Sequence, residues 1–490
     1  MTYLGVDCGT SAIKIVLVDD EERTLASAES AYLPGHPHPG WSEQDPRDWR
    51  AAMFGALHQI RVAAPAAYGA AKALSFSGQM HSAVLLDGAG APVRPAILHN
   101  DQRAFAEAAQ LAKRHPELMR IVGVKPMAGF TAPKLLWLAR HEPEGFRNVK
   151  TILLPKDYLR FELTGEARTD MSDAAGTWWL DEAQRRWSEA ALAASGVRLD
   201  QVPALVEATD RVAALRPAIA DELGLPRGLV VAAGGGDSPV GALGLGAIRP
   251  GDAFISLGTA TQLILASDVY RSAPEKLVHS FAHALPGLWY RMAAMLNGAG
   301  ALAFAARFVK AEVAELEREA AEGYRGPGAL TFLPYLSGER TPLDDPHARG
   351  VLFGLSETSS RADYARAVME GVALTLAEAR DCLEATGDEI GDIALIGGGS
   401  RSALWTRMIA AAVNRRLLRY RGAVAGPAYG AARIARIAAT GASPESVCRT
   451  PEIADVTEPE PALVEAFAAK RERFRALYAA LKPEFAAAVV

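Results

Sequence analysis

The amino-acid sequence predicts a mixed α/β protein made of two related domains. Two strand–turn–strand patterns lie about half a chain apart, YLGVD-CGTS-AIKIVLVD at residues 3–19 and AFISL-GTAT-QLILA at residues 253–266. Strand-like and helix-like stretches alternate elsewhere, as they do in α/β proteins. Because 490 residues exceed the size of one compact core, the repeated pattern favours a duplicated domain over a short-period repeat array.

Apolar spacing predicts the individual elements. In EQDPRDWRAAMFGALHQI, residues 43–60, apolar side chains recur at helical spacing, and Asp45 can cap the helix. Residues 362–383 repeat that spacing, so we expect a second long helix there. IALI at residues 393–396 predicts a short buried strand before a glycine-rich turn, and residues 464–481 predict a surface helix.

Composition and charge exclude several classes of protein. Half of the residues are hydrophobic and 22% are charged, which is ordinary for a globular protein. A net charge of −5 attracts neither nucleic acid nor an anionic membrane, so we expect neither as a partner. The start MTYLGVDCGT predicts no signal peptide, and no apolar stretch predicts a membrane span. Three distant cysteines without a CxxC pair predict free thiols in a cytoplasmic protein.

The turns of the two repeated patterns are candidate phosphate sites. Small turn residues let backbone N–H groups approach an anion, and hydroxyls add further donors. Asp7 ends the first strand, where it could reach a magnesium ion on the same phosphate through water. A plain hairpin is an equal alternative for one turn, but two matched turns favour a clamp on a triphosphate. The candidate residues are Gly9, Thr10, Ser11, Gly258 and Thr259.

A third glycine-rich turn, IGGGSRS, contains Gly397, Gly398 and Gly399. It could place a flat ring against the backbone or a helix N-terminus against a phosphate, and a tight structural turn is the alternative. The chain has no GxxxxGKS/T motif, so it is not a P-loop enzyme. GAGALA, residues 298–303, fits GxGxxA without the acidic strand end that a dinucleotide fold needs, so its glycines are interpreted as packing residues.

Two polar segments could bind a small molecule. SGQMH carries polar side chains at a strand end, although a lone histidine is more often a satisfied core residue. HNDQR adds polar groups that could hydrogen-bond hydroxyls. His279 and His283 share one face of an element without a third ligand, so we expect no metal site there. The candidate binding residues are Gln79, Met80, His81 and Asp101.

Asp237 is the most unusual residue of the chain. It follows three glycines inside the almost wholly apolar stretch LVVAAGGGDSPVGALGLGAI, residues 229–248. Burying an ionised carboxylate without a partner is expensive. A carboxylate that rests on the N-terminal N–H groups of the next helix is one explanation. Beside a phosphate clamp, however, Asp237 is also a candidate general base.

Together these segments resemble the FGGY family of carbohydrate kinases, most closely its bacterial members that phosphorylate D-xylulose. Residues 129–141 fit the first family signature, and residues 350–370 fit the second with a tyrosine at one apolar position. Seven further segments look like those of the family and follow in the expected order: WSEQDP, SGQMH, LLPKDYLR, DMSDAAGT, GGGD, FLPYLSGERTP and IGGGSRS. The resemblance therefore covers nearly the whole chain.

The resemblance implies two actin-like, ribonuclease-H-like domains, residues 1–248 and 249–490, with the active site in the cleft between them. It implies that the first domain binds the sugar and the second binds ATP, with Mg²⁺ as the metal. Asp237 falls on the catalytic base, and Asp7 on the aspartate that serves magnesium and activity. The family often dimerises, so the resemblance allows a homodimer, although no segment of the sequence marks an interface.

The resemblance also assigns roles to the remaining candidate residues. Met80 and His81 fall on the sugar-binding pair, the Gly258–Thr259 turn on the phosphate loop, and residues 397–399 on the adenosine loop.

Departures from the family pattern leave the sugar open. His99, Gln102 and Ser238 differ from the usual residues and could line the sugar pocket. D-Xylulose is the first expectation, and another ketose or polyol, such as ribulose, glycerol or gluconate, is the alternative. An actin-like structural or chaperone protein is a third alternative, but it would need no general base beside a binding pocket. A nicotinamide-dependent dehydrogenase is the weakest alternative, because the GxGxxA segment lacks the acidic strand end that a dinucleotide fold needs.

Overall fold

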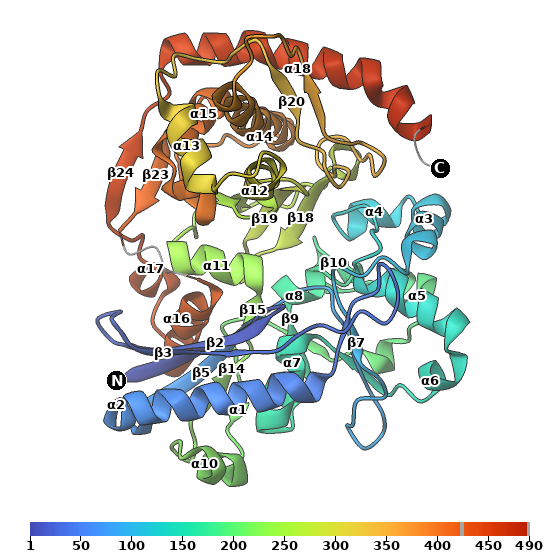
Figure 1. Cartoon of the computed structure of the whole chain (residues 1–490). Coiled ribbons are helices and arrows are strands. Elements are labelled where there is room, and N and C mark those ends of the chain that lie inside the picture. Colours follow the sequence, from blue (N-terminus) through green and yellow to red (C-terminus); the bar gives the residue numbers. More distant parts are fainter. Residues whose placement is uncertain (422–425, 488–490) are drawn as a thin grey trace.

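The structure is a computed structural model that describes residues 1–421 and 426–487. It contains two sheets of seven strands (Figure 1). The first sheet contains β1 (Thr2–Cys8), β2 (Ala12–Asp19), β3 (Thr24–Ala31), β5 (Ala71–Gly78), β13 (Arg211–Ala214), β14 (Val230–Ala232) and β15 (Gly235–Gly236). The second contains β16 (Ala253–Leu257), β17 (Thr261–Ser267), β18 (Val278–Ala282), β19 (Trp289–Met295), β22 (Ile393–Ile396), β23 (Leu417–Tyr420) and β24 (Ile453–Thr457).

The two sheets share one strand order. In the first, β1 pairs antiparallel with β2 and β2 with β3, while β1 pairs in parallel with β5 and β5 with β14. In the second, β16, β17 and β19 form the antiparallel part, and β22 and β23 continue in parallel from β16. An antiparallel edge strand, β13 or β24, follows in each. The expected pair of duplicated α/β domains is thereby confirmed.

Helices pack on these sheets and form much of the chain between their strands. Those in the first half are α1 (Pro46–Ala63), α2 (Pro65–Gly69), α3 (Phe105–Arg114), α4 (Leu118–Ile121), α5 (Thr131–His141), α6 (Pro143–Arg147), α7 (Pro155–Thr164), α8 (Met171–Ala175), α9 (Glu189–Ala194), α10 (Pro217–Leu223) and α11 (Asp237–Leu245). Those in the second half are α12 (Ala299–Phe308), α13 (Val313–Ala321), α14 (Arg361–Glu384), α15 (Ala403–Val413), α16 (Pro427–Thr440), α17 (Pro444–Val447) and α18 (Pro461–Ala487).

Short strand pairs complete the fold. They are β4 (Glu43–Gln44) with β7 (Ala96–Ile97), β6 (Val84–Leu86) with β8 (Thr151–Leu153), β9 (Arg168–Asp170) with β12 (Ala204–Val206), β10 (Leu180–Asp181) with β11 (Arg186–Trp187), and β20 (Thr331–Leu333) with β21 (Val351–Phe353). Three 3₁₀ turns, η1 (Leu199–Gln201), η2 (Pro274–Lys276) and η3 (Gly398–Arg401), are also present in the described residues. No helix of the described ranges is long and apolar enough to cross a membrane.

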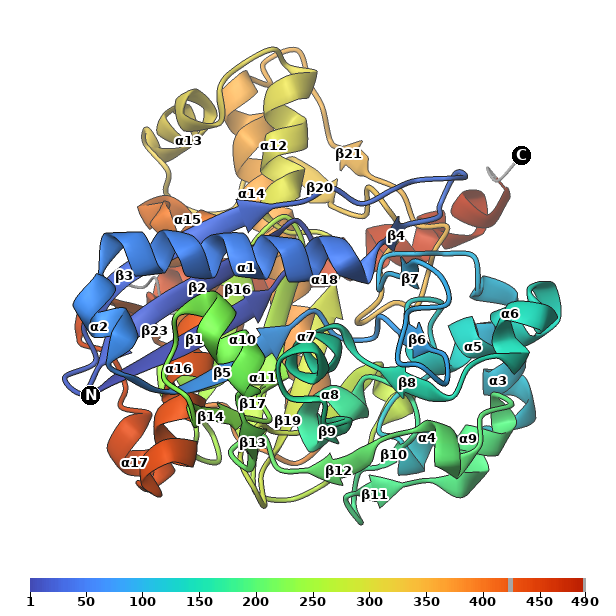
Figure 2. The same cartoon turned by 90° about the horizontal axis from the view of Figure 1, so that it is seen from below.

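Helix α16 lies on the first sheet although it comes from the end of the chain. Figure 1 shows it in orange-red above the blue strands, with α1 below them, and Figure 2 shows α1 lying across β2 and β3. Gly5 of β1 makes this contact possible, because a Cβ there would lie 1.9 Å from the carbonyl oxygen of Ala428. The chain therefore returns to the first sheet after it has built most of the second.

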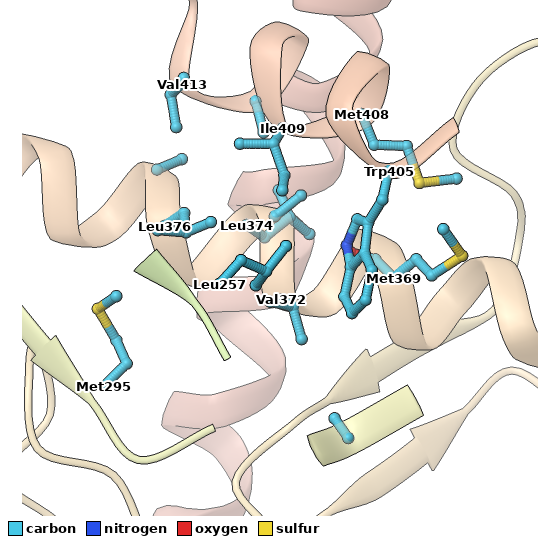
Figure 3. Close-up of a cluster of buried hydrophobic side chains, with 14 of the residues drawn as sticks. Leu257, Met295, Met369, Val372, Leu374, Leu376, Trp405, Met408, Ile409 and Val413 are labelled. Carbon is cyan, nitrogen blue, oxygen red and sulfur yellow. The ribbon is translucent and has the colours of Figure 1, made fainter. Parts of the chain in front are cut away.

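The second sheet has a hydrophobic core on each face. Since side chains alternate along a strand, Ile255 and Leu257 of β16 face α12, α14 and α15, and Phe254 faces the other way. Figure 3 shows the first of these cores, in which the indole N–H of Trp405 donates to the carbonyl oxygen of Met369 at 2.9 Å. The second core joins the two halves of the chain; its members include Met80, Phe130, Trp178, Phe254, Phe281 and Met292.

Candidate active site

A cavity of about 160 Å³, here called the central cavity, lies where the two halves of the chain meet. Its polar lining residues are His81, His99, Asp237 and Ser238 from the first half and Gln262, His279 and Arg340 from the second, and Met80 also lines it. Carboxylate, imidazole, hydroxyl, amide and guanidinium groups all face this small cavity. It is therefore suited to a small polar molecule.

The three glycines before Asp237 bring its backbone against β5. Gly235 and Gly236 form β15, which pairs with Ser77 and Gly78 at the end of β5. Gly234 has a φ of +73°, and a Cβ there would lie 2.2 Å from the carbonyl oxygen of Phe76. A Cβ on Gly236 would lie 2.8 Å from Met80. Glycine is thus required on both sides of the turn, and α11 then begins at Asp237, facing the cavity.

Asp237 is held by its neighbour. The backbone N–H and the hydroxyl of Ser238 donate to Oδ1 at 2.7 and 3.2 Å. No donor within the described residues reaches Oδ2, so that oxygen is available to a ligand. Burial raises the pKa of Asp237, and the bonds from Ser238 oppose that shift. A raised pKa makes this carboxylate a stronger base than an exposed aspartate.

Asp7 lies at the end of β1, close enough to Asp237 for its charge to matter. Burial, followed by the negative charge of Asp237, raises the pKa of Asp7 to about 7. The Ser77 hydroxyl lies near enough to oppose this shift, but no donor of the described residues comes within hydrogen-bond distance of the buried Oδ1. An orphaned carboxylate oxygen beside a second carboxylate suits a hard divalent cation. The described residues contain no cluster of three or more acidic, histidine or cysteine side chains that could hold a metal, so other ligands would come from water or substrate.

Three neutral histidines present acceptors to the central cavity. His81 Nδ1 lies 2.7 Å from the Gly176 carbonyl oxygen, His99 Nδ1 lies 3.2 Å from Gln79 Oε1, and His279 Nδ1 lies 3.3 Å from the Met292 carbonyl oxygen. A carbonyl oxygen only accepts, so each Nδ1 carries the proton and each Nε2 is left as an acceptor.

Burial keeps these rings uncharged. It is the main cause that lowers the pKa of His81 well below its ordinary value, and it lowers the pKa of His99 and His279 to about 4. At neutral pH all three imidazoles can therefore accept a hydrogen bond from a hydroxyl group.

Two of the predicted binding residues lie behind the cavity wall. Gln79 holds His99 and also donates from Nε2 to the Gly9 carbonyl oxygen at 3.4 Å. Asp101 is fully buried, pairs with Arg103 Nη2 at 2.7 Å and accepts the Ser42 backbone N–H at 2.6 Å. The structure therefore brings Met80, His81 and Asp237 together in the cavity and does not place Asp101 there.

The predicted phosphate turns occupy equivalent places in the two sheets. Gly9, Thr10 and Ser11 connect β1 to β2, and Gly258 and Thr259 connect β16 to β17. Thr259 and Ser11 are exposed to solvent. Both turns therefore present accessible groups at the ends of their strands.

The third glycine turn packs against the second. Gly397 has a φ of +91°, and a Cβ there would lie 2.6 Å from the Leu257 carbonyl oxygen at the end of β16. The start of α12 contacts the Gly258–Thr259 turn. The Ala299 N–H donates to the Gly258 carbonyl oxygen at 2.7 Å, and a Cβ on Gly298 would lie 2.2 Å from the hydroxyl oxygen of Thr261. Gly298 is thus a packing residue, as interpreted from the sequence, and it supports the Gly258–Thr259 turn.

Sequence reasoning missed three polar lining residues. Arg340 lies in the segment FLPYLSGERTP, which the sequence marks only by its family resemblance, Gln262 lies on β17, and His279, which the sequence raises only as a metal ligand, lies on β18. All three come from the second half, and nothing local marks them as facing a cavity formed with the first half. His99 and Ser238, which differ from the family pattern, do line the cavity, whereas Gln102 lines a neighbouring one of about 600 Å³.

Comparisons with known proteins agree with this geometry. The model for the N-terminal domain of the FGGY family of carbohydrate kinases matches residues 2–244, and the model for the C-terminal domain matches residues 253–439. Xylulose kinase of Escherichia coli (strain K12) is 42% identical over 492 residues, covering 98% of this chain and 99% of that relative. Xylulose kinase of Bacillus subtilis (strain 168) is 34% identical over 435 residues, covering 88% and 87%.

Solved structures give the same result. The crystal structure of a xyloylose kinase from Brucella ovis superposes with a TM-score of 0.97 at 44% identity, covering 99% of this chain and 100% of that one. Both halves of the chain match the family, and the similarity extends over nearly its full length. The chain therefore belongs to the FGGY family of carbohydrate kinases.

Proposed function

We propose that this kinase transfers the γ-phosphoryl group of ATP to D-xylulose, giving D-xylulose 5-phosphate and ADP. The observation that carries the proposal is the position of Asp237 at a small polar cavity, where its Oδ2 meets no donor from the part of the chain that the structure describes. The full-length similarity to xylulose kinases supports the choice of sugar.

In the proposed reaction Asp237 accepts the proton of the C5 hydroxyl group. The C5 oxygen then forms a bond to the γ-phosphorus, and the bond between that phosphorus and the bridging oxygen of ADP breaks. The raised pKa of Asp237 favours the proton transfer, and Ser238 fixes the direction of the carboxylate. Met80, His81 and His99 hold the other hydroxyls against the cavity wall.

ATP binds in this proposal across the three glycine turns. Gly9, Thr10, Ser11, Gly258 and Thr259 hold the phosphates, and Gly397, Gly398 and Gly399 hold the adenosine. Mg²⁺ is the proposed metal, and Asp7 fits it because its buried Oδ1 lacks a partner. When bound, the metal ion would neutralise charge on the transferring phosphate.

We also propose that residues 1–248 and 249–490 act as sugar-binding and ATP-binding domains, with residues 246–252 as their connector. The two sheets support this division, with α16 crossing back to the first. A homodimer in the cytoplasm completes the proposal. The family resemblance supports the dimer, and the three cysteines, none of them disulfide-bonded in the structure, suit a reducing compartment.

A panel of acceptors tests the choice of sugar. ADP release should be measured with D-xylulose, L-xylulose, D-ribulose, L-ribulose, glycerol and D-gluconate, each against a blank without sugar. D-Xylulose should give the highest kcat/KM. If another acceptor exceeds D-xylulose tenfold or more, the chain is a kinase of that acceptor, and His99 and Ser238 are the first residues to examine because they line the cavity.

A further inference from the structure

Arg340 belongs to a loop that is hydrogen-bonded to the end of β19 and to the residues that follow it. The Glu339 carboxylate accepts the Leu296 backbone N–H at 2.6 Å and the Asn297 side-chain amide at 3.1 Å. On the other side, the Thr341 N–H donates to the Ala294 carbonyl oxygen at 3.2 Å, and the Thr341 hydroxyl donates to the Leu277 carbonyl oxygen at 2.9 Å. The backbone around Arg340 is therefore held on both sides.

Arg340 lines both the central cavity and the neighbouring cavity of about 600 Å³, and its guanidinium has no protein partner in the described residues. Within the described chain it makes no ion pair at 4.0 Å or less and no side-chain hydrogen bond. The nearest acid in sequence, Glu339, is occupied by Leu296, Asn297 and the backbone N–H of Arg340 itself at 2.9 Å. Arg340 is half-buried; burial lowers the pKa of its guanidinium, and the charge of Glu339 opposes that shift without forming an ion pair at 4.0 Å or less. This side chain therefore has five N–H donors to offer to a ligand.

The other polar groups of the central cavity are mostly acceptors. His81, His99 and His279 present Nε2, and Asp237 presents Oδ2. The Ser238 hydroxyl is already committed to Asp237 at 3.2 Å. Sugar hydroxyls can donate to all of these acceptors, but a carbonyl oxygen only accepts. Among the described lining residues Arg340 is the only permanent cation, with the neutral amide of Gln262 as a weaker donor.

We infer that Arg340 is a specificity-determining residue whose guanidinium donates hydrogen bonds to the C2 carbonyl oxygen of the ketose. The inference rests on the proposed function, in which the C5 hydroxyl lies at Asp237 and the C1–C2 end lies away from it. The position of Arg340 agrees with this orientation: its charge helps to lower the pKa of His99 and His279, and it forms no ion pair with Asp237 within 4.0 Å. Arg340 thereby separates ketoses from alditols, which lack the carbonyl.

The test compares D-xylulose with xylitol, which differs by a hydroxyl in place of the carbonyl. Wild-type enzyme should prefer D-xylulose, and Arg340→Met should lower kcat/KM for D-xylulose about 10–100-fold, since it removes a charged hydrogen-bond donor from a buried acceptor. The value for xylitol should change by about threefold or less, so the preference collapses. Arg340→Lys should keep part of the preference, because it retains the charge and loses the planar fork. Turnover should be measured by NMR detection of the phosphorylated product.

Arg349→Met is the matched control. Arg349 is exposed near the same loop, and its Nη1 donates to the carbonyl oxygens of Pro346 at 2.9 Å and Ala348 at 2.8 Å. This variant should keep the wild-type preference. If Arg340→Met and Arg340→Lys lower both acceptors equally, or change neither, the inference is wrong and Arg340 is a structural residue. If the wild-type enzyme phosphorylates xylitol as efficiently as D-xylulose, the inference is likewise wrong, whereas a wild-type enzyme that does not phosphorylate D-xylulose at all contradicts the proposed function.

Discussion

At the scale of single residues, Asp7 and Asp237 combine burial with like charge. Burial and the charge of Asp237 raise the pKa of Asp7 to about 7, although an aspartate ordinarily titrates near 3.8. Two carboxylates so placed repel each other unless a cation or a proton lies between them. This arrangement costs stability and is consistent with a metal-assisted phosphoryl transfer.

Asp7→Asn tests the metal role of this residue. The amide keeps the shape and removes the negative charge, so we expect a large fall in kcat and a Mg²⁺ concentration for half-maximal rate raised about 10–100-fold. Binding of D-xylulose, followed by calorimetry, should remain close to wild type. A variant that loses sugar binding while its magnesium dependence stays unchanged would assign Asp7 to the sugar instead.

Lys134 is a buried cation that no carboxylate neutralises within ion-pair distance in the described residues. It is 1% exposed, and its Nζ donates to the Ile97 carbonyl oxygen at 3.2 Å. Burial lowers the pKa of Lys134 from 10.5 to about 7. Between these two pH values the unfolded chain binds a proton that the folded protein lacks. The cost to folding is thus complete below pH 7 and disappears as the pH rises toward 10.5.

Lys134→Met removes this titration. Between pH 7 and pH 9 the free energy of unfolding of the wild-type protein should rise by about 2 kcal/mol relative to that of the variant, which lacks the amine. The difference, variant minus wild type, should therefore fall by about 2 kcal/mol over that range. Urea unfolding at several pH values measures the difference. Lys150→Met is the control, since Lys150 is exposed to solvent, and its difference from wild type should stay constant. Parallel curves for Lys134→Met and wild type would show that the buried amine does not titrate in this range.

Single residues differ in how well sequence alone predicts them. Asp237 could be predicted because a carboxylate inside an apolar, glycine-rich stretch is conspicuous, and Met80 and His81 because they end a strand. For Asp101, the sequence predicts a binding role and does not show that Arg103 engages its carboxylate at 2.7 Å outside the lining of the central cavity. Arg340 was missed since its position depends on a contact between distant segments.

At the scale of elements, the packing of α16 on α11 positions the helix that begins with Asp237. Gly430 of α16 makes the close approach possible, because a Cβ there would lie 1.9 Å from the Val240 carbonyl oxygen in α11. Gly241 of α11 faces the same neighbour more loosely, and its Cβ would lie 3.8 Å from Pro427 Cγ. Gly241 can therefore serve as the control position for a substitution at Gly430.

Gly430→Ala should destabilise the protein by about 2–4 kcal/mol, because backbone atoms must move to admit the methyl group. It should also lower kcat, since α11 carries Asp237 and a shift of the base impairs the geometry of attack. Gly241→Ala should be neutral or stabilise the protein by up to about 1 kcal/mol, because alanine favours a helix and ordinary space is available. Thermal unfolding and steady-state kinetics measure both. Equal effects of the two variants would contradict the close contact.

Local patterns predicted most elements and left their partners open. The helices predicted at residues 43–60 and 362–383 are α1 and α14, shifted by three residues or fewer at either end, and Asp45 caps α1 by accepting the Arg47 N–H at 2.9 Å. The strand predicted at residues 393–396 is β22. The side of the molecule on which α16 lies was not predicted, because helical periodicity shows which face is apolar and not which sheet covers it.

At the scale of the whole molecule, the two halves are joined near the central cavity by a shared core. Phe130 and Trp178 from the first half pack in one cluster with Phe281 and Met292 from the second. This core holds the two halves together beside the central cavity. The phosphate turns belong to separate sheets and can approach each other if the halves rotate about the core.

We expect the cleft to close when both substrates are present, because a kinase must keep water from taking the phosphate. Small-angle scattering should give a smaller radius of gyration with D-xylulose plus a non-hydrolysable ATP analogue than for the free protein, whose value should be about 23 Å if it is monomeric. Sugar alone should change it less, since the sugar end is already packed. Identical curves under all conditions would exclude a closure of useful size.

The central claim is that Asp237 removes the proton of the C5 hydroxyl of D-xylulose. Its most direct test is single-turnover phosphoryl transfer by Asp237→Asn at saturating ATP and Mg²⁺, with the product identified by NMR and ATP binding measured by calorimetry. The account predicts D-xylulose 5-phosphate from the wild-type enzyme and a rate about 10²–10⁴-fold lower from the variant, with ATP binding retained. A variant that transfers phosphate at nearly the wild-type rate would contradict it.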